Sequence, residues 1–256
     1  MWPFKKRIKP IEEPLIAKSV ICIPGLWNNI DELKNLIFSS SNGEYMVVGE
    51  ILLSIKKERH YKFEIGGRDE RMTASFKCTG KTTMIPYDCL NKIEKHNFVI
   101  YISGETGSLR EAENIAFAGA EVLKAGGIGI KIDTAGKAFE KSEWLNLVKN
   151  FDETDLYQMF VASPIVDEKS GVFSCGMHNL GLKDTIIQGE ELQRSIDLVS
   201  IFGYYQIFDK PVILPHQTFQ PDLQSPKYLI TDEPNQPYKG RGLFENPYGM
   251  WRLTRI

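Results

Sequence analysis

The residues with the most evident chemistry lie in one segment, GVFSCGMHNLGLKD, at residues 171–184. Cys175, His178 and Asp184 supply a thiol, an imidazole and a carboxylate, the groups that cysteine hydrolases use as nucleophile, base and orienting group. On a strand, positions three apart point to opposite faces, so Cys175 and His178 would need a turn at Gly176 to meet. These three residues are the candidate catalytic set.

The same segment allows two other interpretations. Cys175 and His178 have the spacing of half a zinc site, but a structural site needs four ligands, and only Asp184 and His216 could complete it through the fold. In the structural interpretation, which we favour, Cys175 and Met177, or Leu180 and Leu182, are mostly buried, and Gly176 or Gly181 has a positive φ. We therefore assign no metal-binding or cofactor-binding residues.

Three glycine-containing stretches suggest phosphate binding but do not fit its requirements. The GKT run at 80–82 lacks the earlier glycine of a phosphate loop, because Ser75 stands there, and Pro86 follows too soon for a helix. The glycines at 126–129 come after a predicted helix and before a strand, the reverse of a dinucleotide fingerprint.

The third stretch, SGETGSLREAE at 103–113, follows a predicted strand and opens a helix. Its carboxylates would repel a phosphate, whereas Ser108 followed by Glu111 is typical of a helix N-cap. We interpret this stretch as a cap.

Composition restricts the class of protein. The chain has 256 residues, 42% hydrophobic and 25% charged, as in ordinary globular proteins. A net charge of −2 does not favour nucleic-acid binding, and no stretch has the roughly 20 apolar residues of a membrane helix. The apolar run at 15–23 is interrupted by Lys18, which argues against a signal peptide. Together with four widely spaced cysteines, these features predict reduced thiols and a cytoplasmic location.

The periodicity predicts an α/β or α+β fold with a mixed sheet, at least one βαβ crossover and a proline-rich C-terminal extension. The crossover is the strand 98–103, the helix 108–124 and the strand 128–132, with the two strands parallel. We expect an exposed N-terminal arm at 1–16 and a single domain at 17–256 with a loop-rich tail from about 210.

Other elements follow from shorter patterns. We expect strands at 19–24, 44–55, 61–65, 172–177, 212–214, 228–231 and 250–254. We also expect four helices: one that ends at the SSSNG run, one over 86–96, one that begins after a Ser142 cap, and one over 190–208. Residues 72–86 are interpreted as strand plus loop, and 156–161 fits either type.

The FSCGMHNLGLKD run, with IKIDTAGKAF and Trp144 upstream, resembles an uncharacterised bacterial family, a domain of unknown function. Its members have a similar alanine–glycine loop after a strand, a tryptophan-bearing helix and a Cys-Gly-Met-His-Asn-Leu-Gly-Leu-x-Asp segment. The resemblance spans roughly residues 69–206, and its most specific part is the Gly-Met-His-Asn-Leu-Gly run. Family members occur beside toxin–antitoxin-like and contact-dependent secretion genes, which implies an immunity protein, and the resemblance brings no catalytic residue.

Two hypotheses follow. The first is a cytoplasmic immunity protein that binds a co-encoded toxin and occludes its active site, with an interface and an oligomeric state that the sequence leaves open. The second is a hydrolase-type enzyme that uses Cys175, His178 and Asp184 in a pocket with convergent polar groups. The incomplete catalytic patterns favour the binding protein over the enzyme, with no nucleic-acid or membrane partner.

Overall fold

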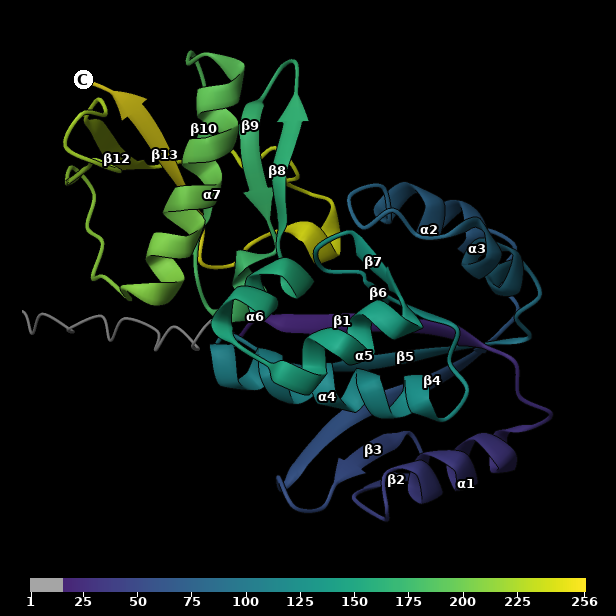
Figure 1. Cartoon of the computed structure of the whole chain (residues 1–256). Helices are drawn as coiled ribbons and strands as arrows, with labels where there is room; N and C mark the ends of the chain where they lie inside the picture. The colour runs from purple at the N-terminus through teal and green to yellow at the C-terminus, as the bar shows by residue number, and fades with distance from the viewer. Residues whose placement is uncertain (1–15) are drawn as a thin grey trace, which may run out of the picture.

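A computed structural model describes residues 16–256 and has an α+β fold built on two sheets (Figure 1). The expected exposed arm, apart from Ile16, lies outside the described residues. Within the described part, no helix is both long enough and apolar enough to cross a membrane.

The first sheet has seven strands in the order β2-β3-β4-β5-β1-β6-β7, and all neighbours are antiparallel. Its members are β1 (Lys18–Gly25), β2 (Tyr45–Val48), β3 (Ile51–Ser54), β4 (Arg59–Gly67), β5 (Phe98–Glu105), β6 (Gly129–Ile132) and β7 (Lys137–Glu140). The interior strand β1 is buried over most of its length because helices cover both of its faces there.

The predicted crossover is present in a modified form. Helix α4 (Leu109–Lys124) connects β5 to β6, and both strands run antiparallel to β1, so they are parallel to each other as expected. They are not neighbours, however, because β1 lies between them. A strand inserted from an earlier part of the chain leaves no trace in the local pattern of 98–132.

Side chains alternate between the two faces of the first sheet. Ile21 and Ile23 pack in the cluster under α4 and α1 (Ile30–Ser40), whereas Cys22 packs under α2 (Met72–Thr79) and α3 (Tyr87–Glu94) on the opposite face. Two further helices, α5 (Lys141–Leu147) and α6 (Glu153–Phe160), extend the α4 layer.

Several local predictions are wrong. Residues 72–79 are helical because Met72 and Phe76, four positions apart, are both buried on one helix face. The expected strand at 44–55 is a hairpin, turned at Gly49 with a φ of 59°. The cap of α5 is Glu140 rather than Ser142, and residues 212–214 form no strand.

The second sheet has six strands in the order β11-β12-β13-β10-β9-β8, with β10 and β13 parallel. Its members are β8 (Ala162–Asp167), β9 (Gly171–Cys175), β10 (Asp184–Ile187), β11 (Thr218–Phe219), β12 (Tyr228–Asp232) and β13 (Met250–Arg255). Helix α7 (Leu192–Phe208) covers one face, and the loop bearing Tyr238 and Phe244 covers the other. The proline-rich region after 210 thus supplies three strands of this sheet.

The stability of the core cluster under α4 and α1 depends strongly on the Trp144 side chain. It is fully buried, its Nε1 donates to the carbonyl of Ala116 at 3.2 Å, and its ring meets Phe139 and Phe160 edge-on. We expect Trp144→Ala to lower the free energy of unfolding by about 3–5 kcal/mol through the cavity and the lost ring contacts. Chemical denaturation measures this loss. Tyr87→Ala, at a position that is 76% exposed, is the control, and its free energy of unfolding should stay within about 0.5 kcal/mol of that of the wild type.

Candidate functional site

The segment 171–184 forms a buried junction between the two sheets. Strand β9 ends at Cys175, a 3-10 turn follows at Met177–Leu180, and β10 begins at Asp184. Gly176 and Gly181 flank the turn with φ of 112° and 79°. A Cβ on Gly176 would lie 2.2 Å from the carbonyl oxygen of Phe160, so no other residue fits there. The first expected pair, Cys175 and Met177, is buried, whereas in the alternative pair Leu180 is buried and Leu182 only partly so; the positive φ values are confirmed.

Asn179, at the centre of this turn, uses all of its hydrogen-bonding capacity. Its Oδ1 accepts from the hydroxyls of Ser19 (2.5 Å) and Thr134 (2.9 Å), at the ends of two strands of the first sheet. Its Nδ2 donates to the carbonyls of Phe160 (3.3 Å) and Gly176 (2.7 Å). The side chain is fully buried, so these four bonds replace all of its contacts with water.

Asp184 is a buried carboxylate with hydrogen-bond donors on every side. Its Oδ1 accepts from the hydroxyl of Ser174 (3.0 Å) and the N–H of Met177 (3.2 Å), and its Oδ2 accepts from Tyr238 and Asn246 at 2.7 Å each. Burial raises the pKa of Asp184 to about 6, although the four donors oppose that rise. The carboxylate joins β9, the turn and the C-terminal loop.

The candidate catalytic residues are close in the chain but do not form a catalytic array. Asp184 accepts from four donors, none of which is His178, and His178 Nδ1 has no partner within the described residues. Cys175 Sγ lies 3.8 Å from the carbonyl oxygen of Phe244, and burial raises the pKa of its thiol well above the usual value. Burial also lowers the pKa of His178 to about 4. A protonated thiol without a base is a poor nucleophile.

The zinc alternative gains no support from the geometry. Across residues 16–256, no three histidine, cysteine, aspartate or glutamate side chains are grouped to hold a metal ion. His216 lies on an exposed turn with a φ of 70°, whereas Asp184 is buried at the junction.

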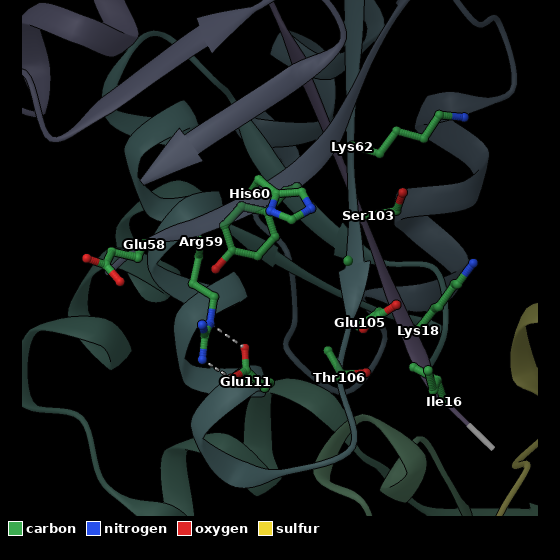
Figure 2. Close-up of a pocket in the computed structure, with 12 residues that line it drawn as sticks. Ile16, Lys18, Glu58, Arg59, His60, Lys62, Ser103, Glu105, Thr106 and Glu111 are labelled. Atoms are coloured by element: carbon green, nitrogen blue, oxygen red, sulfur yellow. Dashed lines mark hydrogen bonds and ion pairs between the residues drawn. The ribbon is translucent and has the colours of Figure 1, made fainter. Parts of the chain in front are cut away.

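A cleft of about 690 Å³ lies elsewhere, where β1, β4 and β5 end beside α4 (Figure 2). In the first sheet, Lys18 stands opposite Glu105 and Lys62 opposite Ser103, so these side chains point to one face. Figure 2 shows His60 beside them, and Arg59 forming a double hydrogen bond with Glu111 at the far wall.

Several polar side chains of the cleft are unused by the fold. Within residues 16–256, the side chains of Lys18, His60, Ser103 and Glu105 make no hydrogen bond or ion pair. No motif in the sequence marks Lys18, His60 or Ser103 as functional, and Glu105 is one of the carboxylates of 103–113 that would repel a phosphate. These four residues come from three distant segments of the chain. The only feature of the local sequence that could indicate them is their outward-facing position in strands with alternating side chains.

The cleft continues into an apolar stripe on the same face. Val48 stands opposite Ile51 and Met46 opposite Leu53, and Ile51 in turn stands opposite Lys62. Val48 and Ile51 are 51% and 42% exposed. The clusters under α2 and α3 include none of these side chains. We call the apolar stripe and the cleft together the open face.

Comparisons of the chain with family models, with curated proteins and with solved structures each find no match. The buried junction and the open face therefore carry the functional argument.

The buried carboxylate predicts a pH dependence of stability. The folded pKa of about 6 lies above the value of about 3.9 usual for an unfolded aspartate, so the folded state holds its proton more tightly. The stability that Asp184 contributes is complete below about pH 4 and is lost as pH rises through about 6, by up to about 3 kcal/mol.

Asp184→Asn removes this titration. The difference in free energy of unfolding, wild type minus variant, should therefore decrease as the pH rises from 4 to 6.5. Taking the difference cancels His178, whose lowered pKa acts in the opposite direction in both proteins. Urea titrations at several pH values measure it. A difference that stays constant with pH would contradict this account of the carboxylate.

Proposed function

We propose that this protein is a cytoplasmic immunity protein, which binds a co-encoded toxin at a 1:1 ratio and occludes its active site. The observation that carries the proposal is the burial of Cys175, His178 and Asp184 in the junction, where the contacts of Cys175 and Asp184 serve the fold. A protein whose most reactive side chains are structural acts through its surface.

The open face suits such a role. It combines exposed apolar side chains on β2 and β3 with charged and polar groups of the cleft that lack partners within the described chain. Exposed apolar residues bordered by polar ones are typical of protein-binding surfaces. We take the kind of partner, a co-encoded toxin, from the resemblance of the FSCGMHNLGLKD run to a family found beside toxin genes.

The hydrolase hypothesis has less support. Cys175, His178 and Asp184 lack the mutual hydrogen bonds of a catalytic array, and the cleft at the ends of β1, β4 and β5 is lined by other residues. No contact of these three side chains favours turnover over structure.

The proposal predicts that protection does not depend on the reactive side chains. Cys175→Ser with His178→Ala, in a variant shown by circular dichroism to remain folded, should protect against the co-encoded toxin as the wild type does at a 1:1 ratio. Toxin activity is titrated against increasing amounts of each protein. Loss of protection in the folded variant, or full protection at strongly substoichiometric amounts, would identify an enzyme instead.

A matched pair of surface variants locates the interface in the same assay. Val48→Asp introduces a charge into the open face, and Val166→Asp introduces it at a similarly exposed strand position of the second sheet. We expect Val48→Asp to weaken binding by about tenfold or more and Val166→Asp by less than about twofold. Equal effects would place the interface elsewhere without affecting the stoichiometry result.

A further inference from the structure

A second hollow lies near the Gly25 end of β1, whereas the cleft of the open face lies near the Lys18 end. It has a volume of about 620 Å³ and opens between α3, the Gly127–Ile128 loop and the start of α5. Its size falls within the range of pockets that hold small molecules. None of its residues takes part in the junction or in the open face.

The pocket has an apolar floor and a charged rim. Its apolar lining consists of Pro86, Cys89, Ile128 and Leu145, of which Cys89 and Ile128 belong to the cluster beneath α3 and supply the floor. Burial raises the pKa of the Cys89 thiol to about 11, so this side chain is an uncharged part of the floor. A floor of this kind favours an apolar ligand body.

The pocket is lined by two carboxylates and two ammonium groups, and among these only Lys141 has neither a hydrogen bond nor an opposite charge one turn away on the same helix. Asp88 and Lys92 lie one turn apart on α3, where opposite charges offset each other, and Glu140 accepts a hydrogen bond from Ser142. Lys141 is half-buried and makes no hydrogen bond or ion pair within the described chain. Burial lowers its pKa, which shows that its ammonium group has lost part of its hydration.

We propose that this pocket binds an amphipathic organic anion, whose apolar body lies over Ile128 and Leu145 and whose carboxylate meets Lys141. An anion there would replace the hydration that the ammonium group loses, and the apolar body would cover the floor. This site is independent of the proposed immunity function, because it lies away from the open face.

The probe is 1-naphthaleneacetate, and its uncharged analogue 1-naphthaleneacetamide is the matched control of nearly the same shape. Isothermal titration calorimetry measures both affinities, and amide chemical shifts of Gly127 and Ile128 locate the site. We expect the acid to bind at least about fivefold more tightly than the amide, as one charge-assisted contact provides. Lys141→Met should abolish that preference, and Lys141→Arg should retain it.

Lys149→Met, just after α5 and outside the pocket, controls for a general loss of positive charge and should leave the preference unchanged. Three results would each overturn the proposal: no binding of the acid at millimolar concentration, equal affinities for acid and amide, or a preference that survives Lys141→Met. The comparison of acid with amide needs only the wild-type chain, so it holds even if a variant fails to fold.

Discussion

The hydrogen bonds of the Asn179 side chain are the constraint on which the two-sheet arrangement depends. This amide lies where two strands of the first sheet end and where the chain turns into the second sheet. A buried amide that loses even one partner costs about 1–3 kcal/mol, so all four partners must stand in fixed positions. Gly176 and Gly181 make this possible, because the backbone around them approaches too closely for any side chain.

The hydrogen bonds of Asp184 fix the position of the C-terminal loop in the same way. It gathers donors from β9, the turn and two distant loop residues, Tyr238 and Asn246, without a cation among its hydrogen-bond partners. Burial beside this carboxylate raises the pKa of Tyr238, so its hydroxyl remains a donor. Of the residues that suggest catalysis in the sequence, Cys175 and Asp184 thus contact groups of the fold, whereas Lys18, His60 and Ser103, which have no such partners among the described residues, line the cleft. Structure and proposed function occupy different parts of the molecule.

The sequence predicts those features that depend on neighbouring residues. The helix at 108–124 with its Ser108 cap, the strands that flank it and the buried, glycine-turned segment at 171–184 all follow from local periodicity and turn chemistry. Two features of the sheets leave no local signal because they join segments some 65 or more residues apart along the chain. They are the insertion of β1 between β5 and β6 and the parallel pairing of β10 with β13. The cleft could not be predicted for the same reason, since Lys18, His60 and Ser103 meet only through strand register.

The most direct test of this account is the free energy of unfolding of Asn179→Asp, measured by urea denaturation near pH 7. This change keeps the shape of the side chain but turns a carboxylate oxygen towards the carbonyls of Phe160 and Gly176, which Nδ2 contacts in the native protein. We predict a loss of about 3 kcal/mol or more, with hydrogen exchange accelerated in both β1 and β10, because a buried, unmatched charge would disrupt the joint between the sheets. A loss below about 0.5 kcal/mol, the range of surface substitutions, would contradict the central role of this side chain.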